Sequence, residues 1–580
     1  MTSLDTAAGT MHWLDIAVVV VYLVGVTVVG VWTSRHLSGL NDFFMPRRFG
    51  KGMMIMHAFG TGTASDQAVT VAAATFKGGL SGIWYQWLWL FVTPFYWLIA
   101  PIFRRFRAVT TADVYELRFD RSVAVLFSVV GIANLSVKIG LMLKGVGVLI
   151  ESATGSWVDT QWAILAVTCM FVLYGAAGGL AAAIVTDYLQ GLLTILFSVM
   201  LLPFVLSAVG GLAGVHETIV DPGFLSMVAP GKVTWFFVVM MSLQALVGIV
   251  AQPFIMGVCA AGKTEWEGRV GFAVGNLIKR VCTVAWSLTA LAAVAWYIQR
   301  GVDPATIMPD HVYGDVARSF LPDITPGLLG LFVATVLAGV MSSCDAFMVS
   351  GAALFTENIY KPVVSQRTQT HYIWIGRLAS IVVVAGGVAF ASWVPSIVKA
   401  LEIWFMIAPM MGLVFWIGLL WRRMTVVGAW ATTLTGFIVW WMSTRDWMID
   451  RVARLPVVNS WQLLWSEDGV STIHLPWQIL CYTCIASGVG IVVSLVTQPV
   501  SQEKLDRFYS LTRTPVAQGE QILEPCVLPA DTPCVPRKML LTAAGLEIPQ
   551  PSQTSLIGFA ALWLCVAAMI GAFVWLITFA

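Results

Sequence analysis

The chain has 580 residues, of which 58% are hydrophobic and only 11% are charged, and its mean hydropathy is +0.82. Soluble proteins carry about a quarter charged residues, so this composition excludes a soluble protein and predicts one surrounded by membrane lipid. The net charge is only +2 and the basic residues are dispersed, which argues against nucleic-acid binding.

Apolar runs long enough to cross a membrane recur along the whole chain. A spanning helix needs about 20 apolar residues, and by that measure we count fourteen candidate spans. No P-loop, G-x-S-x-G or H-E-x-x-H motif is present, so we expect neither an ATP-driven pump nor any other enzyme. The expected spans are 13–33, 52–76, 80–103, 122–153, 160–175, 180–210, 233–256, 268–298, 326–355, 372–395, 399–421, 425–443, 475–497 and 555–579.

The basic residues predict how the spans are oriented. If the first loop is cytoplasmic, the connections on its side hold 21 Lys and Arg residues and those on the other side hold 8. Because basic residues concentrate in cytoplasmic loops, both termini are expected outside the cytoplasm. We expect a multi-pass protein of the plasma membrane, a bacterial inner membrane.

The second span contains signs of an interrupted helix. Gly60 and Gly62 each weaken a helix by about 1 kcal/mol relative to Ala, and Asp66 and Gln67 follow at once. Secondary transporters use a helix broken near the midplane to build ion and solute sites from freed carbonyl groups. Close helix packing explains the glycines but not the acid and the amide, so we predict a site here.

The third and fourth spans add further polar groups. Gln86 lies between Trp84 and Trp87, a setting that suits either an organic solute or an interfacial aromatic belt. Lys138 lies more than a turn from either end of its span, so we expect it to pair with an acid of a neighbouring helix. That pair could be structural or could bind a ligand.

Acidic and hydroxyl groups gather on two later spans. Gly178 and Gly179 permit a tight turn before Asp187, and the span 326–355 contains Ser342, Ser343 and Asp345. A carboxyl group at mid-bilayer costs roughly 2.5–3.5 kcal/mol on insertion scales, so each acid needs compensation. Together these hard oxygen ligands suit an alkali cation.

The seventh span predicts a second break, because Gly248 and Pro253 interrupt it five spans after the first. Two broken helices that head consecutive sets of five spans indicate an inverted repeat. A polar, proline-rich segment near the C-terminus contains LDRFYSLTRTP, which we expect to lie on the inner membrane surface. The expected units are 1–50 (peripheral helix and first cytoplasmic loop), 51–213 (first repeat), 214–231 (extracellular loop), 232–423 (second repeat), 424–497 (peripheral helices), 498–553 (cytoplasmic linker) and 554–580 (C-terminal helix).

Several stretches resemble the sodium:solute symporter family over about residues 12–425. They are NDFFMPRR, GGLSGIWYQW, FRRFRAVTTADVYELRF, YGAAGGLAAAIVTDYLQ and AGVMSSCDAFMVSGAALFTENIYKP. The resemblance implies an all-α protein of the LeuT-like fold, with ten core helices in two inverted five-helix repeats plus peripheral helices.

The resemblance also implies site residues. The family's main sodium site uses two backbone carbonyls of the broken first core helix, which match Gly60 and Thr63 here. It also uses a small residue and two hydroxyl residues of the eighth core helix, which match Gly339, Ser342 and Ser343. A nearby acid of the family matches Asp187. Some members bind a second sodium through hydroxyl groups just beyond the serine pair. This chain has Asp345 and Ala346 at those positions, so it departs from the family pattern, and Asp345 is a candidate sodium ligand. The positions that contact the solute in the family's sugar transporters match Gly62, Asp66, Gln67, Gln86 and Lys279. At Gly62 and Gln86 the side chain differs from the one in the sugar transporters.

The expected function is sodium-coupled symport of a small polar organic solute, with a sugar or sugar derivative favoured and with no cofactor besides Na⁺. Alternatives are a carboxylate or amino-acid symporter, a transporter coupled to protons through Asp187 and Asp345, and a sensor built on the transporter fold. Arg280 could bind a carboxylate or be structural.

Overall fold

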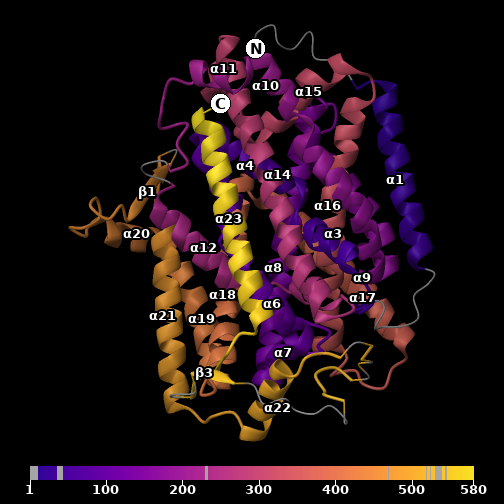
Figure 1. Ribbon diagram of the computed structural model, residues 1–580, viewed down its shortest axis with the longest axis vertical. Coiled ribbons are helices and arrows are strands. Elements are labelled where there is room, and N and C mark those ends of the chain that lie inside the picture. Colours follow the sequence, from indigo (N-terminus) through magenta and orange to yellow (C-terminus); the bar gives the residue numbers. More distant parts are fainter. Residues whose placement is uncertain are drawn as a thin grey trace.

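The fold is taken from a computed structural model (Figure 1). It describes all residues except 1–10, 35–43, 229–232, 468, 518, 521, 523, 530–537, 542–544 and 580. Within the described elements, the side chains of 30, 31, 33, 34, 173–179, 467 and 579 are not described.

Long apolar helices form most of the molecule. In the described part of the chain, ten helical segments are long and apolar enough to cross a membrane, and three further apolar helices are shorter. The number of fourteen spans stays a prediction. The ten are Leu80–Arg105, α8 (Arg121–Ala153), Leu180–Val209, α14 (Glu265–Gln299), α16 with its π-helical extension (Leu328–Tyr360), α17 (Gln369–Trp393), α18 (Ile397–Leu420), α19 (Val426–Ser443), α21 (Leu475–Val496) and α23 (Gln553–Phe579).

Both predicted helix breaks are present. The predicted second span divides into α3 (Lys51–Gly62) and α4 (Ser65–Gly78). The predicted seventh span divides into α12 (Trp235–Ile249) and α13 (Ile255–Ala260). In the first break, Thr63 and Ala64 adopt extended backbone angles, so the helical hydrogen bonds stop at this point. The second break contains Pro253, which has no backbone N–H to continue a helix.

The remaining elements include two long helices, α1 and α9, and several short ones. Hydrogen-bonded caps fix where several begin: Thr110 and Asp113 form a capping box before α7, and Thr264 and Glu267 form one before α14. The others are α1 (Trp13–Ser34), α5 (Trp84–Trp87) and α6 (Thr93–Arg105) within Leu80–Arg105, α7 (Thr111–Arg118), α9 (Thr160–Met200), α10 (Leu202–Val209), α11 (Gly211–Thr218), α15 (Val312–Ile324), α20 (Asp446–Ala453), α22 (Gln502–Arg513), and the antiparallel pairs β1–β2 (Leu464–Glu467, Val470–Ile473) and β3–β4 (Met539–Leu541, Ile548–Pro549).

The helix α9 contains two predicted spans in one run of helical backbone. A straight helix of its 41 residues would be about 60 Å long. Yet the backbone N–H of Thr160, at its start, donates a hydrogen bond to Glu151 at the end of α8. Near its other end, the ring centre of Phe197 lies 5.5 Å from that of Tyr313 of α15. Because α15 abuts the same end of α8, α9 must bend back on itself.

The described side chains of α9 fall into two arms, Thr160–Val172 and the part from Leu180 onward. Gly178 and Gly179, the predicted turn, lie in the stretch whose side chains are not described. The second arm contains Asp187 and packs against α3 and α16, which positions this acid beside the first helix break.

The polar segment before α23 is attached to protein rather than lying free on the membrane surface. The apolar side of α22 is buried, and Phe508 packs 5.3 Å from Phe106 while the Tyr509 hydroxyl donates to the Gly418 carbonyl. Protein side chains therefore cover this face of α22, and its position on the inner membrane surface stays a prediction. In Figure 1 α22 and α7 lie together at the lower end.

Candidate ion and solute site

The broken turn after α3 packs directly against the double-serine motif of α16. The Ser343 hydroxyl donates to the Gly60 carbonyl at 2.7 Å. A Cβ atom added to Gly60 would lie 2.7 Å from the Ser342 hydroxyl oxygen, so only glycine allows this approach. The predicted carbonyl and hydroxyl ligands from two distant helices therefore meet in space.

Asp187 lies at the same junction, completely buried. One of its carboxylate oxygens accepts a hydrogen bond from Ser342, and the other lies 2.6 Å from Nδ1 of His57, whose exposed fraction is 1%. These partners supply the compensation that an acid at membrane depth requires. The sequence reasoning missed His57, although it precedes Gly60 by one helical turn and so faces the same way.

The other predicted sodium ligands surround this junction. A Cβ on Gly339 would lie 3.7 Å from the Cα of Ala64, so α16 approaches the break at this point too. Thr63 is in the break, and its buried hydroxyl oxygen has no hydrogen-bond partner in the part of the chain that the structure describes. Asp345 is buried one turn beyond Ser342 and acts electrostatically on Tyr22 of α1, so its assignment as a ligand stays a prediction.

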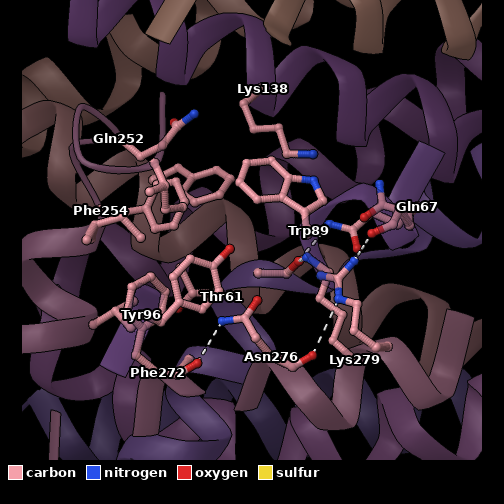
Figure 2. Close-up of a pocket in the computed structure, with 18 of the residues that line it drawn as sticks. Thr61, Gln67, Trp89, Tyr96, Lys138, Gln252, Phe254, Phe272, Asn276 and Lys279 are labelled. Atoms are coloured by element: carbon pink, nitrogen blue, oxygen red, sulfur yellow. Dashed lines mark hydrogen bonds between the residues drawn. The ribbon is translucent and has the colours of Figure 1, made fainter. Parts of the chain in front are cut away.

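A cavity of about 580 Å³, open space included, lies on the other side of the same break. Four of the five residues predicted as solute contacts line it, namely Gly62, Gln67, Gln86 and Lys279, and their contact with a solute stays a prediction. Figure 2 shows Tyr96, Phe254 and Phe272 on one side of the cavity and Gln67 and Lys279 on the other. The lining aromatic residues are Trp89, Tyr96, Phe254, Phe272, Phe347 and Trp404.

The fifth predicted contact, Asp66, is not among the lining residues and instead forms a buried ion pair. Its Oδ2 atom accepts a hydrogen bond from Lys138 at 2.8 Å. The prediction that Lys138 pairs with an acid of a neighbouring helix is thus confirmed, and that acid is Asp66. Lys138 also lies 4.5 Å from the ring centre of Trp404 and lines the cavity.

Two further basic side chains, Lys279 and Arg280, line the cavity from α14. The Lys279 ammonium donates to the Gly62 carbonyl, and the Arg280 guanidinium donates to the Gln86 carbonyl. Among the described residues, neither has a carboxylate partner. The sequence left open whether Arg280 binds a ligand or is structural, and the structure shows that it lines the cavity.

The arrangement of long helices around two broken ones defines a membrane transporter. A family model described as the sodium:solute symporter family matches residues 43–436. This chain therefore belongs to the sodium:solute symporter family, whose members are transporters and not enzymes.

Similar curated proteins carry different solutes in their names. A sodium/glucose cotransporter of Vibrio parahaemolyticus is 24% identical over 72% of this chain and 83% of its own length. The osmoregulated proline transporter OpuE of Bacillus subtilis (strain 168) is 25% identical over 82% of this chain and 94% of its own. A sodium/pantothenate symporter of Escherichia coli (strain K12) is 26% identical over 73% of this chain and 88% of its own length.

Among solved structures, a sodium-coupled sialic acid symporter in a substrate-bound, outward-open state is similar. The TM-score is 0.69 at 17% identity, over 85% of this chain and 99% of that one. The likeness supports the LeuT-like fold that the sequence predicts, with peripheral helices around the core.

Proposed function

We propose that this protein is a secondary active symporter that imports a small polar organic solute, such as a sugar derivative, together with sodium. The observation that best supports this proposal concerns the broken turn after α3. On one side the turn contacts Ser343 near Asp187, and on the other side it lines the cavity.

Sodium is proposed to bind the carbonyls of Gly60, Thr63 and Gly339 and the hydroxyls of Ser342 and Ser343, near Asp187. Hard oxygen ligands suit an alkali cation, and the carboxylate supplies the countercharge. Binding would replace the direct Ser343–Gly60 hydrogen bond with two contacts to the ion. The ion would then hold α3 and α16 together.

The solute is proposed to occupy the cavity beside Gly62, Gln67, Gln86 and Lys279, with Asp66 acting through Lys138. Alternating access would follow from rocking of the helices around this site, as in other transporters with broken helices. A tenfold sodium gradient contributes about 1.4 kcal/mol to uptake.

The test uses the purified full chain in detergent, heated in sodium chloride or in choline chloride at equal ionic strength. We expect sodium to raise the melting temperature, and the Ser343→Ala variant to lose this response. Cys344→Ala serves as the matched control, because its thiol contacts Met142 instead of the broken turn. A response that is absent in the wild type, or kept in Ser343→Ala, contradicts the assigned site.

Transport itself is tested by uptake of labelled D-glucuronate and D-glucose into proteoliposomes. Uptake that depends on an inward sodium gradient supports symport. Uptake that is unchanged without sodium, or that follows a proton gradient alone, overturns sodium coupling. Absence of uptake of either compound, with no sodium response in the melting temperature, favours a sensor over a transporter.

A further inference from the structure

The cavity holds an excess of positive charge. Lys138, Lys279 and Arg280 all line it, with exposed fractions of 3%, 6% and 0%. The acid that neutralises one of them is Asp66, through the ion pair with Lys138. In the described part of the chain, Lys279 and Arg280 donate hydrogen bonds only to backbone carbonyls. The charged groups acting on Lys279 include Arg280, Lys138 and Asp66.

Backbone carbonyls do not neutralise a buried cation. They satisfy its N–H groups, but the net charge stays in a medium of low dielectric constant, where it is costly. Two such cations in adjacent positions of one helix also repel each other. A neutral solute would leave both uncompensated, whereas an anion between them would compensate both, and carboxylates match the guanidinium fork.

The cavity also offers hydrogen-bond acceptors. The side-chain carbonyl oxygens of Gln67, Gln86 and Gln252 are buried and have no hydrogen-bond partner among the described residues. The orientation of the Gln67 amide is fixed, because its nitrogen donates to the Gly62 carbonyl at 2.6 Å. Buried acceptors are expected to be paired, so the solute should bring O–H donors to them.

An ammonium group could also donate to these oxygens, but the charges disfavour it. Lys138, Lys279 and Arg280 all surround the cavity, and the carboxylate of Asp66 is already engaged. Hydroxyl groups supply the same donors without adding a fourth positive charge. The aromatic rings of Tyr96 and Phe272, stacked with their centres 4.0 Å apart, supply an apolar wall for carbon-bound hydrogens.

Resting on the proposed symport function, we propose that the solute is a small hydroxylated carboxylate, such as a sugar acid. Its carboxylate lies between the Lys279 ammonium and the Arg280 guanidinium, and its hydroxyls donate to Gln67, Gln86 and Gln252. This assigns Arg280 as a residue that selects charge.

The test compares compounds that share a skeleton and differ in charge, using thermal stability of the purified full chain in sodium chloride. The sets are D-glucuronate, D-glucose and D-glucosamine; D-glycerate and glycerol; pantothenate and pantothenol. We expect at least one carboxylate to raise the melting temperature more than its neutral or cationic counterpart. A larger shift with the neutral or cationic member in every responding set, or no response to any carboxylate, overturns the proposal.

Variants separate the charge from the fold. Arg280→Gln is expected to lower the affinity for the responding carboxylate at least tenfold, and Arg280→Lys to retain more of it. Lys144→Met, a basic residue of α8 outside the cavity lining, is the matched control and should bind like the wild type. Equal carboxylate affinity in Arg280→Gln and in the wild type contradicts the assignment.

The sodium response distinguishes the two proposals. If sodium alone stabilises the protein but no carboxylate does, the charge proposal fails while symport stands. If sodium has no effect in the wild type, the proposed symport function fails first.

Discussion

The Nδ1 atom of His57 lies 2.6 Å from Oδ2 of Asp187, and both side chains are buried within the helix bundle. Ser342 donates to the other oxygen of the same carboxylate. Asp187 is therefore fixed from two sides, by α3 and by α16. This makes His57 a positioning residue for the proposed sodium site.

Replacing His57 should weaken sodium binding. In His57→Ala the buried carboxylate loses one partner, and a hydrogen bond to a charged group is worth about 1.5–3 kcal/mol. We expect the sodium concentration for half-maximal thermal stabilisation to rise about tenfold or more. His57→Asn, which keeps an N–H donor, should recover part of the affinity.

His216→Ala is the control for the histidine substitution, because His216 contacts the Ile577 carbonyl far along the chain. It should leave the sodium titration unchanged. An unaltered titration in His57→Ala would show that Asp187 does not depend on this partner.

The ion pair between Lys138 and Asp66 should appear as coupling in a double-mutant cycle. Removing one partner leaves an uncompensated buried charge, so Lys138→Met and Asp66→Asn should each cost about 3–5 kcal/mol of stability. The double variant should lose clearly less than the sum of the two. Melting temperatures of the four proteins in detergent measure this, and additive losses would argue against a direct pair.

Gly145 allows α8 to touch the first broken helix. A Cβ atom there would lie 2.8 Å from the Cα of Asp66, a backbone atom that cannot rotate away. Gly145→Ala should therefore destabilise the protein by about 1–3 kcal/mol and reduce sodium-driven uptake. Gly25→Ala in α1 meets nothing within 4 Å and should be neutral or slightly stabilising. Similar melting temperatures for both variants would contradict this packing.

The segment after α22 is held at the ends of the helices by Glu520. Its carboxylate pairs with Arg107 at 2.5 and 2.9 Å, and Val516 donates to Glu265 at the start of α14. Burial alone would raise the pKa of Glu520, but hydrogen bonds from Arg107 and the Ala517 backbone outweigh it. They hold that pKa below its ordinary value of 4.5.

This attachment is therefore complete above about pH 4.5 and is lost as the pH falls below that value, when the carboxylate gains a proton. At pH 7, Glu520→Gln should expose the segment to limited proteolysis, as acid does in the wild type. Glu524→Gln, which changes an exposed acid nearby, is the control. Equal cleavage rates in the Glu520 and Glu524 variants would refute the attachment.

The helices and their breaks could be predicted from the sequence because both depend on local signals. Apolar runs reveal spans, and Gly60, Gly62 and Pro253 weaken or prevent helical hydrogen bonds wherever they lie. The resemblance to a family placed Ser342, Ser343 and Asp187 together, and the structure brings Ser342 onto Asp187 and Ser343 onto Gly60.

The missed features depend on contacts between distant segments. The sequence indicated that Lys138 needs an acid but not which one, because Asp66 is 72 residues away. A single histidine in an apolar run, such as His57, carries no signal until its neighbour on another helix is known. The charge excess of the cavity likewise appears only when Lys138 and Arg280 line one space.

The carbonyl groups of Gly60 and Gly62 are two residues apart, yet the first accepts from Ser343 and the second from Lys279 and Gln67. One short piece of backbone thus takes part in both proposed sites. Any displacement that improves one set of contacts changes the other. Thermodynamic reciprocity then requires that the factor by which sodium changes solute affinity equals the factor by which solute changes sodium affinity.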